Sequence, residues 1–144
     1  MQHSQDYVVR FGEIDHAGVM YYPAIFDRIH RSFEDFWLAA TGLTYAQILD
    51  GDGIGFPLID IQSTFRQPFR FGEVMRVQTS VLRIGRKSIT FQVCLRGADD
   101  GEGEPRATCK LVTGVIAMGE FAPTPLPDRY REWLAPYLVE PVAG

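Results

Sequence analysis

Two groups that could take part in catalysis stand close together near the N-terminus. Asp15 lies in a turn that also holds Gly12 and Gly18, and the turn leads into a segment that begins Tyr22-Pro23. Proline is favoured at a helix start, because its fixed φ suits the first turn and its missing N–H would be unpaired there. Free N–H groups and the positive end of the helix dipole would then lie near the Asp15 carboxylate. A carboxylate beside an oxyanion site supplies the two parts that acyl transfer needs.

Asp15 could serve this chemistry in two ways, and the sequence leaves both open. As a nucleophile it would attack an acyl carbonyl and form a transient anhydride; as a general base it would activate water. The backbone N–H of Tyr22, or of a neighbour in the first helical turn, would polarise the carbonyl. Gly18 would allow either close approach of a substrate or a left-handed turn. The alternative is that Asp15 only holds its own turn together, as aspartates commonly do.

The segment from Phe11 to Pro23 resembles the signature of the 4-hydroxybenzoyl-CoA thioesterase family of hotdog-fold enzymes. It reads Phe-Gly-x-x-Asp-x-x-Gly-x-x-Tyr-Tyr-Pro between an expected strand and an expected helix. The resemblance covers most of the chain, from Tyr7 to Leu138. It implies that Asp15 acts on the carbonyl of an acyl-CoA thioester. It also implies that no metal or redox cofactor is needed and that coenzyme A is part of the substrate.

A later turn, Gly85-Arg86-Lys87-Ser88, supports the resemblance. In the family, basic residues at this position meet the phosphates of coenzyme A, usually across a subunit interface. We therefore expect Arg86, Lys87 and Ser88 to bind substrate, the alternative being a solvated hairpin. The chain has no Walker loop and no Gly-x-Gly-x-x-Gly after a strand, so nucleotide hydrolysis and dinucleotide binding lack support.

The expected lining of an acyl pocket is Phe56 and Pro57, with apolar residues from the following 58–61, although a plain core role would also explain them. His30 is expected on the helix as a pocket-lining or core histidine. The 4-hydroxybenzoyl branch of the family carries an acid at this helix position, suited to a phenolic hydroxyl. His30 therefore argues against 4-hydroxybenzoyl-CoA itself as the substrate.

The pattern of apolar residues predicts the elements that position these groups. Spacings of three and four predict an amphipathic helix from Pro23 to about Thr41, ended by Gly42. A short helix is expected at 45–49 and another at 128–138. Period-two segments predict strands at 57–69, 74–84, 88–97 and 106–118, after a first strand at 7–11. Short turns imply antiparallel pairing, which gives an α+β fold. The resemblance implies its hotdog form, a long central helix wrapped by a five-stranded antiparallel β-sheet.

Length and composition narrow the protein class. The 144 residues fit a single domain, 1–144, and the net charge of −4 argues against general nucleic-acid binding. No apolar run is long enough to span a bilayer, and the polar start of the chain lacks a signal-peptide core. Cys94 and Cys109 are expected to be buried free thiols, so a cytoplasmic location is expected. No His, Cys, Asp and Glu cluster has metal-ligand spacing.

The sequence therefore predicts a cytoplasmic acyl-CoA thioesterase that cleaves an aryl or a short- or medium-chain CoA thioester to the acid and free CoA. The resemblance implies a homodimer with a continuous sheet, or a homotetramer built as a dimer of dimers. Three alternatives stay open: an acyl-carrier-protein thioesterase, a hydratase or dehydratase on the same fold, and a non-catalytic acyl-CoA-binding protein. The lack of a convincing strand histidine argues against the second, and the intact Asp15 motif argues against the third.

Overall fold

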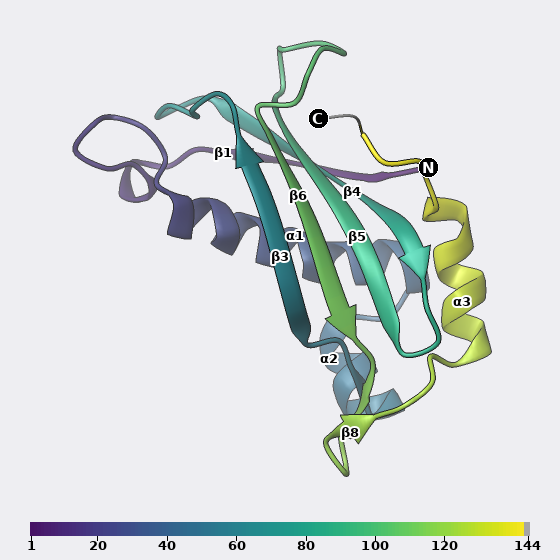
Figure 1. Ribbon diagram of the computed structural model, residues 1–144. Helices are drawn as coiled ribbons and strands as arrows, with labels where there is room; N and C mark the ends of the chain where they lie inside the picture. Colours follow the sequence, from purple (N-terminus) through teal and green to yellow (C-terminus); the bar gives the residue numbers. More distant parts are fainter. Residues whose placement is uncertain (143–144) are drawn as a thin grey trace.

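The computed structural model describes residues 1–142, in which one long helix lies across a five-stranded antiparallel sheet (Figure 1). The helix is α1 (Tyr22–Thr41). The strands, in spatial order, are β1 (His3–Val8), β4 (Val74–Ile84), β5 (Ser88–Gly97), β6 (Ala107–Gly114) and β3 (Leu58–Phe65). The expected α+β hotdog architecture is therefore confirmed, and β1 and β3 form the two edges of the sheet.

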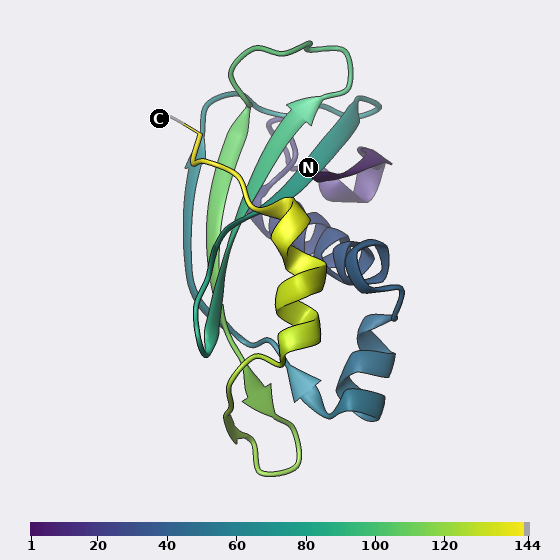
Figure 2. The ribbon, with the colours of Figure 1, turned by 90° about the vertical axis from the view of Figure 1, so that its right-hand side faces the viewer.

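The core lies between α1 and one face of this sheet, called here the inner face. Phe36 and Trp37 of α1 are fully buried, and both rings make edge-to-face contacts with Phe91 of β5. Gly42 ends the helix as expected, with a left-handed φ of 76° and its N–H donating to the Leu38 carbonyl. The helices all lie on this side of the sheet, as Figure 2 shows edge-on.

Shorter elements close the two ends of the core. The helix α2 (Tyr45–Gln47) continues into a π-helical turn (Ile48–Asp52). A small second sheet joins β2 (Ile54–Gly55), β7 (Ile116–Ala117) and β8 (Ala122–Pro123). Near the C-terminus, α3 (Asp128–Leu134) is followed by a 3-10 turn (Ala135–Tyr137), which confirms the expected terminal helix.

The expected first strand at 7–11 is wrong. The strand β1 occupies His3–Val8, where Tyr7 pairs with Met75 of β4, and Phe11–Glu13 forms a 3-10 turn instead. This strand lies at an edge of the sheet and alternates intermediate with exposed residues, so its polar sequence carried no clear apolar alternation.

Two other strands are shorter than the period-two pattern indicated. The strand β3 ends at Phe65 rather than at residue 69, and β6 ends at Gly114 rather than at residue 118. Beyond Gly114 the chain leaves the main sheet and pairs within the smaller one, which preserves the alternation that the sequence showed. Cys94 and Cys109 are both free and buried, as expected.

Candidate active site

Asp15 lies near the tip of a narrow ribbon in which residues 13–15 run antiparallel to 19–21. The Asp15 N–H donates to the Val19 carbonyl over 2.9 Å, and the Tyr21 N–H donates to the Glu13 carbonyl over 3.2 Å. Gly18 closes the tip with a φ of 82°, a conformation that other residues rarely adopt. Of the two roles considered for Gly18, the left-handed turn is the one observed.

The two oxygens of the Asp15 carboxylate have different surroundings. Oδ1 accepts a hydrogen bond from the Ala17 N–H at 2.8 Å and a longer one from the Val19 N–H at 3.5 Å. Oδ2 accepts no hydrogen bond within residues 1–142, and the side chain is exposed. Asp15 thus holds its own turn with one oxygen and leaves the other free for chemistry, so the structural and catalytic roles are compatible.

The start of α1 presents an open backbone donor. The helix begins at Tyr22, one residue before the expected start, so Pro23 is its second residue and not its first. The N–H groups of Ala24 and Ile25 both donate to the Tyr21 carbonyl. The Tyr22 N–H has no acceptor among the described residues, and Pro23 has no N–H. A 20-residue helix therefore directs its positive end, with one unpaired donor, toward the solvent next to the ribbon.

An ion pair that the sequence analysis did not identify attaches the ribbon to α1. The Arg28 guanidinium donates to both carboxylate oxygens of Glu13, over 2.6 and 2.8 Å. Glu13 also accepts from the Arg10 N–H at 2.8 Å. The hydrogen bonds from Arg28 lower the pKa of the Glu13 carboxyl below its ordinary value. This ion pair attaches the base of the ribbon to α1 at Arg28, which lies one to two helical turns beyond the open Tyr22 N–H.

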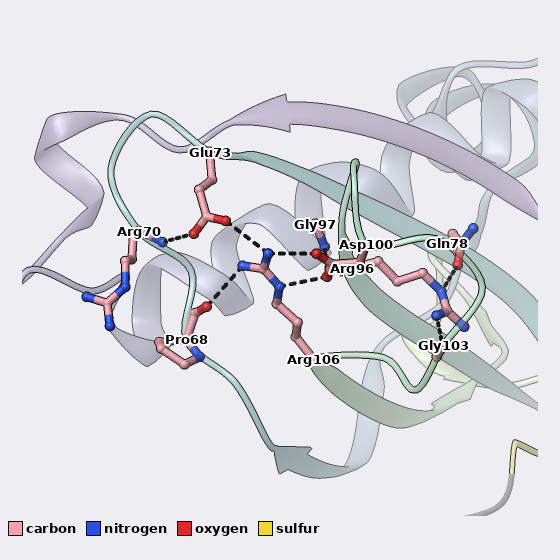
Figure 3. Close-up of polar contacts among 9 residues, drawn as sticks. All are labelled: Pro68, Arg70, Glu73, Gln78, Arg96, Gly97, Asp100, Gly103 and Arg106. Carbon is pink, nitrogen blue, oxygen red and sulfur yellow. Dashed lines mark hydrogen bonds and ion pairs between the residues drawn. The ribbon is translucent and has the colours of Figure 1, made fainter.

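A second support lies beneath the ribbon, in the connection from β3 to β4. The Met20 N–H donates to the Phe69 carbonyl over 2.8 Å. The Phe69 ring lies under the Arg106 guanidinium, 4.8 Å from its carbon. Arg106 in turn binds Glu73 and Asp100 through charged hydrogen bonds of 2.8 to 2.9 Å and donates to the Pro68 carbonyl at 3.1 Å (Figure 3). Arg106, the residue directly before β6, thus supports the Phe69 residue whose carbonyl holds Met20, two residues before α1.

A cavity of about 430 Å³ lies between α1 and the inner face of the sheet. Its lining is mainly apolar and aromatic. The helix contributes Phe26, Ile29, His30 and Phe33; the sheet contributes Leu58, Ile61, Thr79, Phe91, Val93, Leu111 and Thr113; the remaining residues are Tyr45, Phe56 and Pro57. The expected pocket residues His30, Phe56 and Pro57 are therefore among its walls. Phe26 and Phe33, which also line the cavity, were not among the pocket residues expected from the sequence.

The cavity begins one helical turn beyond the open donor. The rings of Tyr22 and Phe26 are in edge-to-face contact, with centroids 6.3 Å apart, and Phe26 lines the cavity. Four residues of α-helix correspond to about 6 Å along the axis. His30 follows after a further turn and is mostly exposed, with Nε2 3.9 Å from Glu34. An acyl group whose carbonyl met the Tyr22 N–H could therefore extend along α1 into the cavity.

The basic residues expected to bind substrate do not lie beside Asp15 or the cavity. Arg86 and Lys87 are exposed in the hairpin between β4 and β5, and Ser88 is the first residue of β5, where it pairs with Gly114. Figure 1 shows this hairpin and the Asp15 ribbon at opposite ends of the molecule. One protomer alone therefore does not bring Arg86 and Lys87 to Asp15.

Within residues 1–142, no helix is long and apolar enough to cross a membrane. In the same part of the chain, no three His, Cys, Asp or Glu side chains are grouped so that they could hold a metal ion.

Comparisons with known proteins agree with this fold. The model of the thioesterase-like superfamily matches residues 9–134. A 1,4-dihydroxy-2-naphthoyl-CoA hydrolase of Synechococcus elongatus is 25% identical over 128 residues, which cover 88% of this chain and 90% of that protein. A thioesterase-superfamily crystal structure from Jannaschia sp. CCS1 superposes with a TM-score of 0.87 at 20% identity, covering 95% of this chain and 93% of that one. The crystal structure of a 1,4-dihydroxy-2-naphthoyl-CoA thioesterase from Synechocystis superposes with a TM-score of 0.81 at 19% identity. This match covers 94% of this chain and 96% of that one. At these identities the two structures establish a shared fold.

Proposed function

The chain belongs to the thioesterase-like superfamily, and from that premise we propose that it hydrolyses an aryl thioester of coenzyme A to the carboxylic acid and free CoA. The observation that carries the proposal is the free Oδ2 of Asp15 on a ribbon that leads directly to the open Tyr22 N–H. Two observations support an aryl acyl group. Relatives of the chain are named 1,4-dihydroxy-2-naphthoyl-CoA hydrolases, and the cavity beyond the donor is lined by aromatic rings.

Asp15 can promote hydrolysis by either of two routes. In the first, Oδ2 attacks the thioester carbon, the CoA thiolate leaves, and water hydrolyses the resulting mixed anhydride. In the second, the carboxylate takes a proton from water as the water oxygen attacks, and the thiolate leaves as the tetrahedral intermediate collapses. In both, the Tyr22 N–H donates to the oxyanion. A single turnover in isotopically labelled water separates them, because only the anhydride route can transfer an Asp15 oxygen to the product.

A second copy of the chain would complete the site. The strand β3 is an unpaired sheet edge that exposes Leu58, Ile59 and Phe65, which are 53%, 66% and 46% accessible. Such an edge favours pairing with another strand. We propose a homodimer in which two sheets join along β3, with a dimer of dimers as a further possibility. Arg86, Lys87 and Ser88 of one protomer would then bind the CoA phosphates of a substrate held by Asp15 of the other.

The first experiment measures thiol release from benzoyl, hydroxybenzoyl, naphthoyl, phenylacetyl and aliphatic CoA thioesters by wild type and by Asp15→Asn. Asparagine keeps an Oδ1 that can accept from the Ala17 N–H, so the turn should persist. We expect kcat to fall by about 10² to 10⁴-fold, the usual contribution of a positioned base. Asp27→Asn, an exposed change on α1, is the matched control and should leave kcat unchanged.

The outcome also decides between the alternative functions. Equal turnover of acyl-CoA and acyl-pantetheine would favour an acyl-carrier-protein thioesterase. Tight binding of acyl-CoA without thiol release would favour a binding protein and would overturn the proposed hydrolysis. An Asp15→Asn variant as active as wild type would remove Asp15 from the mechanism. We expect no metal or cofactor to be required, so dialysis against a chelator should not change the rate.

A further inference from the structure

A third segment of the chain pairs with the Asp15 ribbon and carries an arginine. Within the ribbon, Ile14 pairs antiparallel with Met20. On its other side, Val19 pairs antiparallel with Arg70, which lies in the connection from β3 to β4. The two arms of the ribbon and the segment at Arg70 therefore form a miniature three-stranded antiparallel sheet beside the start of α1.

Asp15 and Arg70 lie on the same face of this miniature sheet. Strand residues alternate between the two faces. Met20 and Phe69 face the core and are 5% and 1% accessible. Asp15, Val19 and Arg70 occupy the alternate positions, and Asp15 and Arg70 are exposed. Two cross-strand spacings place the Cα atoms of Asp15 and Arg70 about 10 Å apart.

The guanidinium of Arg70 is unoccupied while its backbone is fixed. Within residues 1–142, this guanidinium makes no ion pair or hydrogen bond, and Figure 3 shows it directed away from the Arg106 network. The Arg70 N–H donates to Glu73 Oε1 over 2.7 Å, and the Arg70 carbonyl accepts the Glu73 N–H over 3.2 Å. Glu73 Oε2 is already bound by Arg106. A charged group free of partners on a fixed backbone suits a residue that binds a ligand.

The leaving group of the proposed reaction extends past this guanidinium. The acyl group runs from the Tyr22 N–H along α1 into the cavity, so the sulfur and the chain attached to it extend the other way, over the exposed face of the ribbon. At roughly 1.3 Å per bond of an extended chain, the first amide oxygen of pantetheine lies about 7 Å from the thioester carbon, and the pyrophosphate about 18 Å from it. Of these two groups, the amide fits the separation of about 10 Å between Asp15 and Arg70.

We propose that Arg70 binds the carbonyl oxygen of the pantetheine amide nearest to the thioester sulfur. This inference rests on the proposed function and adds a residue that recognises the leaving group. A guanidinium carries five N–H donors, and its charge strengthens a hydrogen bond to a carbonyl oxygen. The phosphates lie farther along the chain, where the proposed dimer would supply Arg86 and Lys87.

The test compares three leaving groups on the same benzoyl group. They are CoA, N-acetylcysteamine, which keeps the nearest amide alone, and pentanethiol, which has a similar length and no amide. We expect Arg70→Met to lower kcat/KM by about ten-fold for the first two thioesters, the effect of one charged hydrogen bond, and to leave the pentyl thioester unchanged. Arg70→Ala should give the same pattern. Arg31→Met, an exposed change on α1 outside the cavity wall, is the matched control and should behave as wild type.

Two other patterns would overturn the amide site. A loss confined to the CoA thioester would assign Arg70 to the phosphates. An equal loss for all three thioesters would assign it to Asp15 or to the fold of the ribbon, because neither role depends on the amide.

A binding measurement separates this proposal from the proposed function. Phenacyl thioethers of N-acetylcysteamine and pentanethiol cannot be hydrolysed, and calorimetry gives the Kd of each. If wild type hydrolyses no thioester but Arg70→Met weakens the N-acetylcysteamine thioether alone, the hydrolysis fails and the amide site stands. If Arg70→Met and wild type show the same ratio of the two Kd values, the amide site is overturned whether or not thioesters are hydrolysed.

Discussion

Glu13 is the residue through which the Asp15 ribbon is attached to the central helix. Its carboxylate accepts two hydrogen bonds from Arg28, and its backbone carbonyl accepts the Tyr21 N–H at the base of the ribbon. The side chains of Glu13 and Arg28 are only 17% and 18% exposed, so solvent screens this ion pair weakly. One residue thus connects the turn that carries Asp15 with the helix that carries the proposed oxyanion donor.

Glu13→Gln should lower the free energy of unfolding by about 1 to 2 kcal/mol at neutral pH, because charged hydrogen bonds to Arg28 are lost. The folded-state pKa of Glu13 lies below its ordinary value of 4.5. The stabilisation is therefore fully present above that ordinary value and is lost as the pH falls through the lowered pKa. Urea unfolding across acidic and neutral pH should show the wild-type and Glu13→Gln curves converging in acid. Glu132→Gln, an exposed change on α3, should show no such pH-dependent difference.

At the scale of elements, the Asp15 ribbon is supported by two other connections, the one between β3 and β4 and the one between β5 and β6. Arg106 joins the latter two by binding Glu73 and Asp100 (Figure 3). Those carboxylates raise the pKa of Arg106 above its ordinary value, and Arg106 lowers the pKa of each. Arg106 also stacks on the Phe69 ring, and the Phe69 carbonyl accepts the Met20 N–H at the base of the ribbon. Ion pairs and one cation–π contact therefore support the ribbon from below.

Arg106→Gln should destabilise the protein by about 2 to 3 kcal/mol, less than the roughly 3–5 kcal/mol of a fully buried pair, since Glu73 and Asp100 are partly exposed. It should also lower kcat more than it raises KM, because Met20 precedes the helix with the proposed oxyanion donor, while Arg106 is absent from the cavity wall. Denaturant unfolding and steady-state kinetics check the two effects. Arg76→Gln, which breaks the more exposed pair with Asp6, is the control and should change stability by less than about 1 kcal/mol. Normal kcat in folded Arg106→Gln would show that the network serves stability alone.

At the scale of the whole molecule, the separation of the Asp15 ribbon from the Arg86–Lys87 hairpin is the reason for proposing that a second copy of the chain contributes to each site. Both groups are needed to hold one acyl-CoA under the proposed function, yet they lie at opposite ends of the protomer (Figure 1). In a symmetric dimer each site would combine Asp15 of one copy with the basic hairpin of the other.

Complementation tests this arrangement. Asp15→Asn and the double variant Arg86→Ala, Lys87→Ala should each have low kcat/KM as homodimers. Mixed dimers, co-expressed with two affinity tags and purified through both, should recover about half of the wild-type kcat/KM, because symmetry leaves one site intact and one doubly altered. Mixed dimers that carry Asp15→Asn in both copies are the control and should stay inactive. If the first mixed dimer is no more active than its parents, the shared site is wrong.

Local spacing in the sequence was sufficient for the long helix, for four of the five main strands and for the turn that carries Asp15, because amphipathic periods and turn residues act over short distances. The edge strand β1 was placed wrongly, since its partner β4 lies about seventy residues away and polar edge residues show little alternation. The cavity also required the tertiary structure. Thr113 reaches its wall only through the pairing register of β6 with β3 and β5, and a shift of one residue would turn it to the outer face.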